Sequence, residues 1–215
     1  MTTRTILDDA ANPAHDAFVE KKSEFIGDAC HIDDLDAALA FVETIREMHP
    51  KSRHVAYAAI VTDGTGRVME RMSDDGEPSG TAGKPILDVL RANDLTDCVV
   101  AVTRYFGGIL LGSGGLIRAY STGASLAVKA ARKARIVQCR RFHVRLDYAQ
   151  LGGFQQLLAT VDGAQLDAAF TDHVEVDCAV PTDMEGRFAD RVRETFNATV
   201  VPEPLGLVAR PVEER

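Results

Sequence analysis

The sequence predicts an α+β protein built from two domains. A chain of 215 residues is long enough for two domains of moderate size, and its 46% hydrophobic residues are enough to form a core in each. Between residues 136 and 202 the pattern runs strand, helix, strand, strand, helix, strand, which is the ferredoxin-like order. We therefore expect a polar leader over residues 1–18, one domain over 19–134, a ferredoxin-like domain over 137–205 and a tail over 206–215.

The N-terminal domain is expected to open with a strand and a helix. Residues 1–18 are polar and aperiodic, which is typical of a partly ordered leader. Phe25–Ile32 is predicted as the first strand. Asp33 or Asp34 then precedes apolar residues at helical spacing, so either acid is suited to cap a helix. Pro50 ends that helix, because it moves the preceding residue out of the helical region.

A hairpin and a central strand follow in the same domain. Two β-rich stretches around the turn residues Asp63–Gly66 predict the hairpin. A later continuous apolar run is short enough to be a buried central strand. The elements expected here are strands Val55–Thr62, Arg67–Ser73 and Cys98–Thr103, and helices Gly83–Ala92 and Leu116–Arg132.

A new series of strand-like and helix-like segments begins after Ala134 and predicts the second domain. Thr182 is expected to cap its last helix. The elements expected are strands Ile136–Leu146, Ala164–Phe170, His173–Val180 and Ala198–Pro202, and helices Ala149–Thr160 and Thr182–Asn197.

The amino-acid composition argues against several classes of function. A net charge of −8 argues against a generally basic nucleic-acid binder, although a basic stretch lies over residues 132–145. No apolar stretch reaches the ~20 residues that span a bilayer, and no signal-peptide pattern is present, so we expect a cytoplasmic protein without membrane contact. The four cysteines form no C-x-x-C pair, and the six histidines show no ligand spacing. We therefore predict no disulfide, no metal and no cofactor.

The first of two glycine-rich loops spans residues 74–85 and leads into a predicted helix. One interpretation is a tight turn whose acids are solvated. The other is a binding site, in which two carboxylates face a cleft and the N–H groups of the helix N-terminus attract an anion. The residues assigned by this second interpretation are Asp75, Gly76, Glu77, Gly80, Thr81 and Lys84.

The second glycine-rich loop spans residues 104–116 and follows the predicted central strand. Its first residues lie at a strand exit, where open sheets bind ligands, and its successive glycines are suited to form backbone nests for anions. The alternative is close packing of helix on sheet, which also demands glycine. With Lys22 from the start of the first strand, the anion-binding candidates are Arg104, Tyr105, Gly107, Gly108, Gly112, Ser113, Gly114 and Arg118. We expect both loops to face one cleft.

A catalytic constellation is not evident from residue spacing. His54 precedes a predicted strand, where it is either a general base or a hydrogen-bonded structural residue. No Ser–His–Asp or Cys–His arrangement can be assembled. Catalytic residues are therefore left unassigned.

The first domain contains an ordered set of motifs: Lys22–Phe25, Asp75–Leu87, Val99–Gly108 with Gly112, and Gly115–Tyr120. Together they cover about residues 20 to 130. This set resembles the IMPACT family, including its bacterial YigZ branch. A single glycine loop can arise by chance, but this ordered set is highly specific.

The resemblance carries expectations about fold and function. It implies a ribosomal-protein-S5-domain-2-like fold for the first domain and a ferredoxin-like fold for the second, a pair similar to two adjacent domains of translocation elongation factors. Eukaryotic members act in translational control by binding an activator of a stress-responsive eIF2α kinase. Only about 20 residues precede the matching region, so the RWD domain of those members is not expected here. The resemblance therefore leaves the kinase-regulating role open.

Three functional hypotheses follow. The first is a binding module linked to translation regulation, with the ribosome, RNA or a translation-regulatory protein as partner, an anionic ligand in the cleft, and no sequence-specific contact with DNA. The second is a small-molecule enzyme acting on a phosphorylated or anionic substrate, with acids of the first loop holding Mg²⁺ through water. The third is protein docking by the apolar tip of the second loop, whose alternative is burial between the domains. The first is the one we favour.

Overall fold

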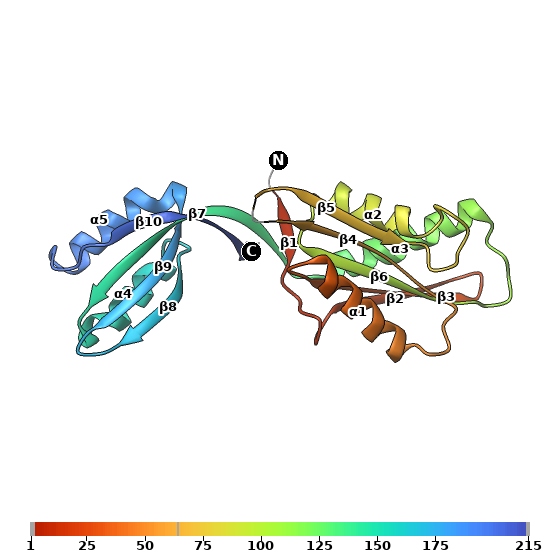
Figure 1. Cartoon of the computed structure of the whole chain (residues 1–215), viewed down its shortest axis with the longest axis horizontal. Coiled ribbons are helices and arrows are strands. Elements are labelled where there is room, and N and C mark those ends of the chain that lie inside the picture. Colours follow the sequence, from red (N-terminus) through yellow and green to blue (C-terminus); the bar gives the residue numbers. More distant parts are fainter. Residues whose placement is uncertain (1–2, 64, 214–215) are drawn as a thin grey trace. The chain divides into compact units, whose positions relative to one another are not determined.

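The computed structural model describes residues 3–63 and 65–213, and the α+β class predicted from the sequence is confirmed. The described chain divides into two compact units (Figure 1). The first runs to Arg135 and includes Glu213, and the second is Ile136–Val212.

A five-stranded antiparallel sheet organises the first unit. Its strand order is β2–β3–β6–β4–β5, with β6 in the centre. Residues 98–104 are buried throughout, as expected for a continuous apolar run that is covered on both faces. The strands are β2 (Ala14–Glu20), β3 (Ser23–His31), β4 (His54–Thr62), β5 (Val68–Ser73) and β6 (Cys98–Tyr105).

Helices cover both faces of this sheet (Figure 1). On one face α1 (Leu35–Met48) buries Phe41 and Ile45 against β4 and β6, and the Asp34 carboxylate caps it by accepting from the Ala37 N–H at 2.7 Å. On the other face lie α2 (Gly83–Ala92) and α3 (Ser113–Ala130), which share a second core with the sheet. Two separate cores therefore hold the first unit together.

The second unit has the element order expected from the sequence. Its sheet order is β10–β7–β9–β8, and both helices contribute to one apolar core. Phe154 and Phe188, one from each helix, are fully buried in that core and lie 6.2 Å apart between ring centres. The elements are β7 (Lys133–Leu146), α4 (Tyr148–Ala159), β8 (Ala164–Phe170), β9 (Val174–Pro181), the 3₁₀ turn η1 (Thr182–Met184), α5 (Glu185–Thr195) and β10 (Glu203–Glu213).

The predicted leader over residues 1–18 is wrong for its described part. β1 (Arg4–Ile6) pairs with the first residues of β7, and β2 pairs along its whole length with β3. The Phe18 ring stacks on Phe25 at 5.3 Å. The few apolar residues of β2 are enough because burial alternates along this strand and only one of its faces is covered, whereas in β1 both Thr5 and Ile6 are buried.

Three predictions in the second half also need correction. The last strand is β10 rather than Ala198–Pro202, so most of the predicted tail over 206–215 is strand, and residues 214–215 lie outside the described residues. Thr182 belongs to η1 and does not cap α5, which begins at Glu185. In the predicted hairpin turn, Gly64 also lies outside the described residues.

Candidate functional site

The first glycine-rich loop is closed by one of its own carboxylates. Asp74 accepts hydrogen bonds from the N–H groups of Gly80 at 2.8 Å and of Ala82 and Gly83 at 2.9 Å. Partial burial acts to raise the pKa of Asp74, but these three bonds outweigh it and hold the pKa below its ordinary value. Asp74 therefore occupies the acceptor position at the N-terminus of α2, the helix end for which an anion was predicted.

Other predicted members of this loop also have internal partners. The Thr81 hydroxyl donates to the Pro78 carbonyl at 2.6 Å. Lys84 pairs with Asp88 one turn further along α2, at 2.8 Å. Their hydroxyl and charge are thus used within the loop and on the outer face of the helix.

Asp75 fastens the loop to the sheet. Its carboxylate accepts from the Val55 N–H at 2.6 Å and from the Arg46 guanidinium at 3.1 Å. Its carbonyl oxygen lies 2.6 Å from Nδ1 of His54, and Gly76 packs beside the same ring. This geometry matches the structural interpretation of His54, since its ring nitrogen is engaged by backbone.

Glu77 enters the interior and joins the two glycine loops. Its Oε1 lies 2.6 Å from a guanidinium nitrogen of Arg104 and 2.8 Å from the hydroxyl of Tyr120 on α3. Arg104 also faces the rings of Phe25 and Phe106. Burial, followed by the nearby charge of Glu77, raises the pKa of Tyr120 well above its ordinary value. Arg104 is therefore neutralised inside the fold rather than free at a strand exit.

The second glycine loop packs tightly at its base. A Cβ on Gly107 would lie 1.9 Å from the carbonyl oxygen of Lys22, and the Gly107 N–H donates to the Ser23 hydroxyl at 3.2 Å. The Tyr105 hydroxyl lies 3.0 Å from Nδ1 of His49. Close packing, the alternative weighed for these glycines, thus accounts for Gly107.

The rest of this loop leads to an uncapped helix end. Gly112 has a φ of 73° and occupies the N-cap position of α3 without a side-chain hydrogen bond. Ser113 and Gly114 open the helix. The first N–H groups of α3 are therefore not occupied by a side-chain cap.

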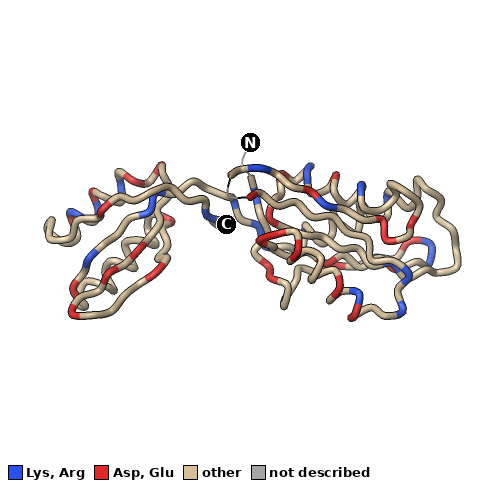
Figure 2. The backbone as a smooth tube through the Cα atoms, viewed as in Figure 1, with Lys and Arg blue, Asp and Glu red and all other residues tan. Residues whose placement is uncertain are grey.

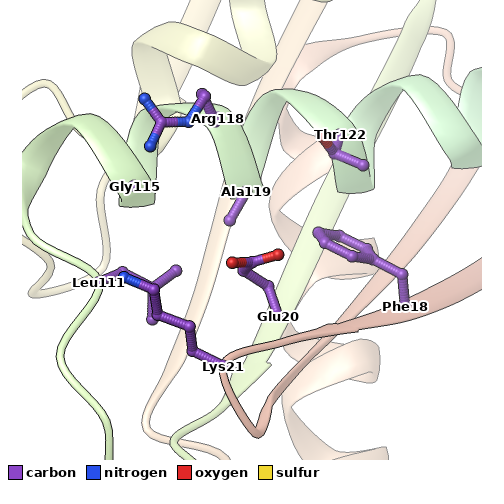
Figure 3. Close-up of a pocket in the computed structure, with 8 residues that line it drawn as sticks. All are labelled: Phe18, Glu20, Lys21, Leu111, Gly115, Arg118, Ala119 and Thr122. Atoms are coloured by element: carbon purple, nitrogen blue, oxygen red, sulfur yellow. The ribbon is translucent and has the colours of Figure 1, made fainter.

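A pocket of about 240 Å³ lies beside this helix end, between α3 and the β2–β3 turn (Figure 3). Lys21 comes from the turn, Glu20 from the end of β2 and Arg118 from α3. Within the described residues, no carboxylate partner is found for Lys21 or Arg118. The pocket is lined by Phe18, Glu20, Lys21, Leu111, Gly115, Arg118, Ala119 and Thr122.

The turn that bears Lys21 has an unusual composition. Glu20 pairs with Ser23, so Lys21 and Lys22 form a two-residue hairpin turn, and their φ values are 47° and 65°. Such turns favour Asn-Gly, because each residue with a side chain costs roughly 1 kcal/mol in this conformation. The chain places two lysines at strained positions, where backbone strain often accompanies function.

The predicted site residues thus separate into distinct groups. Arg118 lines the pocket, and the start of α3 at Gly112, Ser113 and Gly114 adjoins it. Lys22 and Gly108 lie in exposed turns. The residues that contact other residues of the first unit are Asp75, Gly76, Glu77, Gly80, Thr81, Lys84, Arg104, Tyr105 and Gly107.

Sequence reasoning missed most of the pocket lining. No role was assigned from the sequence to Phe18, Glu20, Lys21 or Thr122. The signal that points to them is the two-residue gap between β2 and β3, which requires recognising β2 as a strand.

The basic stretch over residues 132–145 is largely paired with acids. Arg141 lies 2.9 Å from Asp177, and Arg140 lies 3.4 Å from Glu185. Arg132 pairs with an acid of the segment between β1 and β2. The expected positive patch is therefore weakened by neighbouring carboxylates.

The cysteines are buried thiols. Burial is the largest cause of the raised pKa of Cys30 and Cys178, each to about 12, and burial also raises the pKa of Cys98 and Cys139. A protonated, enclosed thiol is a poor nucleophile. Among the described residues, no group of three or more His, Cys, Asp or Glu side chains is arranged to hold a metal ion.

None of the helices in the described part of the chain has the length and apolar character needed to cross a membrane.

The fold defines a two-unit α+β protein with a sheet and its own core in each unit. Residues 21–128 match the Impact N-terminal domain, and residues 144–199 match a domain of unknown function, DUF1949. The chain belongs to the IMPACT family.

Relatives match over most of the chain. IMPACT family member YigZ of Escherichia coli is 37% identical over 81% of this chain and 85% of its own length. IMPACT family member YvyE of Bacillus subtilis is 33% identical over 85% and 83%. A crystal structure of a hypothetical protein is 31% identical, with a TM-score of 0.60 and coverage of 96% of this chain and 98% of that one. The family assignment thus includes both units.

Proposed function

We propose that this protein is a binding module linked to the regulation of translation, and that its first unit receives RNA phosphates at the pocket between the β2–β3 turn and α3. The link to translation rests on family membership, since eukaryotic members act in translational control. We also propose the S5-domain-2-like fold for the first unit and the ferredoxin-like fold for the second. The strand order β10–β7–β9–β8 supports the latter.

The observation that carries the phosphate proposal is the placement of Lys21 and Arg118 around one pocket. Both are exposed and without a carboxylate partner in the described residues, so their charges are available. Lysine and arginine at such positions neutralise phosphates and release counterions. Lys and Arg positions also gather at the end of the first unit that bears this turn (Figure 2).

The uncapped start of α3 strengthens the pocket's preference for anions. Its first N–H groups lack a side-chain acceptor, and the helix dipole favours negative charge at this end. Glu20 acts in the opposite direction, because its carboxylate lines the same pocket. The site therefore combines two cations, a helix end and one opposing acid.

The test is the binding of labelled single-stranded and duplex RNA by fluorescence anisotropy at several salt concentrations. We expect affinity to fall steeply with salt, and the double variant Lys21→Gln/Arg118→Gln to bind about tenfold more weakly with a shallower salt dependence. Glu20→Gln is expected to bind more tightly. Lys84→Gln is the matched control, because that lysine already pairs with Asp88 on α2.

Two outcomes would overturn this proposal. One is RNA binding that is absent or independent of salt. The other is equal loss of affinity in the double variant and the Lys84→Gln control. Binding of inorganic phosphate or nucleotides at this pocket without binding of RNA would instead support the small-molecule alternative.

A further inference from the structure

The second glycine loop presents exposed apolar side chains at its tip. Over residues 106–112, here called the loop tip, Leu110 is 81% exposed, Ile109 42% and Phe106 38%. Ile117 on the adjoining turn of α3 is also 42% exposed. Single exposed apolar residues are ordinary, but a group of them on one loop marks an interaction site.

The loop tip is held outward by contacts at its base. The Gly107 N–H donates to the Ser23 hydroxyl, and a neighbouring Lys22 carbonyl leaves no room for a side chain there. The guanidinium groups of Arg53 and Arg104 lie 5.6 and 5.4 Å from the centre of the Phe106 ring. At the other end Leu111 packs against the core. These anchors fix the base, so docking onto Leu110 needs little further ordering of the chain.

Two exposed cations flank the base of the loop tip, and one acid, Glu20, lines the pocket that Leu111 also lines at the other end. Residues 105–117 contain no charged side chain, and the exposed cations Lys22 and Arg53 adjoin the base. Neither has a carboxylate partner within the described residues. The complementary surface is therefore one that offers large apolar side chains flanked by carboxylates.

We propose that the loop tip docks an acidic protein segment that carries large apolar side chains. Leu110 and Ile109 supply the apolar contact, and Lys22 and Arg53 attract the carboxylates. RNA fits this surface less well, because aliphatic side chains provide no stacking platform for bases. The inference uses other residues than the proposed phosphate pocket, which relies on Lys21 and Arg118, although Leu111 of the loop tip also lines that pocket.

The probe is a displayed library of random dodecamer peptides, selected on the full-length protein. We expect enriched sequences to combine Asp or Glu with Leu, Ile, Phe or Trp. Synthetic copies of these peptides are then expected to bind Leu110→Glu and Arg53→Glu at least about tenfold more weakly than the parent protein. Leu166→Glu, on an exposed position of β8, is the matched control and is expected to bind normally.

Specificity and folding are checked with the same variants. Lys21→Gln/Arg118→Gln is expected to keep its peptide affinity, which separates this proposal from the phosphate pocket. Thermal melting of Leu110→Glu is expected to match the parent protein. Peptides with Asp and Glu replaced by Lys and Arg are expected not to bind.

Three results would overturn the inference. The first is that no acidic, apolar peptides are enriched. The second is a large drop in the melting temperature of Leu110→Glu, which would mean that the protein itself buries this side chain. The third is that Leu110→Glu weakens binding to RNA or to phosphatidylserine vesicles while leaving peptide binding unchanged.

Discussion

The carboxylate of Glu77 accepts a hydrogen bond from the Arg104 guanidinium at 2.6 Å, and their side chains are only 4% and 7% exposed. Glu77 belongs to the first glycine loop, and Arg104, near the end of β6, is the first residue of the second. The pair therefore fixes the two loops to each other inside the first unit. It also removes from the surface the charge of Arg104, one of the residues predicted to bind an anion.

Breaking this pair is expected to be costly. Glu77→Ala leaves the Arg104 charge buried without its partner and removes the acceptor of the Tyr120 hydroxyl. We expect urea unfolding to show that the free energy of unfolding of Glu77→Ala is lower than that of the parent protein by about 3–5 kcal/mol. Asp88→Ala, which breaks the exposed pair with Lys84, is the control and is expected to cost less than about 1 kcal/mol. Equal costs for the two variants would contradict the structural role of Glu77.

Tyr120 is expected to resist ionisation at high pH. Burial and the nearby Glu77 charge raise its pKa in the folded protein above the unfolded value of about 10. Its contribution to stability is thus complete below about pH 10 and declines as pH rises further, because only the unfolded chain releases the proton. Tyrosinate absorbance of Tyr120 should then appear together with loss of the circular dichroism signal. Tyr120→Phe should remove the tyrosinate absorbance that appears together with unfolding. If this absorbance persists in the variant, it does not come from Tyr120.

Asp74 is expected to stabilise the first loop in a pH-dependent way. Its folded pKa is lowered, so its contribution is complete above the unfolded value of about 3.9 and is lost as pH falls through the folded pKa. Asp74→Ala removes three hydrogen bonds and is expected to cost about 2 kcal/mol at neutral pH.

The same comparison in acid provides the control. In acid the difference between Asp74→Ala and the parent protein should shrink as pH falls through the folded pKa of Asp74, because the parent carboxylate then becomes protonated. Urea unfolding at neutral pH and in acid measures this difference in the free energy of unfolding. A penalty that stays the same in acid would show that the charge of Asp74 does not matter.

Two glycines are expected to respond to alanine in opposite directions. Gly107→Ala places a methyl group against the Lys22 backbone and should destabilise the protein by about 3 kcal/mol. Gly152 lies inside α4, where an added methyl group would meet open space, so Gly152→Ala should stabilise by about 0.5–1 kcal/mol. Thermal melting of both variants tests this pair. A tolerated Gly107→Ala would mean that the turn at Lys22 can move away.

Elements with strong local signals could be predicted from the sequence. Helix α1 follows from its apolar spacing and the Asp34 cap, and β6 follows from an uninterrupted apolar run. Strands β1, β2 and β10 could not be predicted in this way. β1 is only three residues long, and the apolar residues of β2 and β10 are interspersed with charged residues, glycine or proline. All three become strands by pairing with β3 or β7.

The candidate site shows the same division. The family, the two glycine loops and the residue types at the start of α3 follow from the sequence alone, because these are properties of neighbouring residues. Which charges are available depends instead on the tertiary fold. Arg104 is neutralised by a carboxylate 27 positions away, and Asp74 fills the helix end predicted for an anion. Lys21 and Arg118 are far apart in the chain and meet at one pocket because the β2–β3 turn lies beside α3.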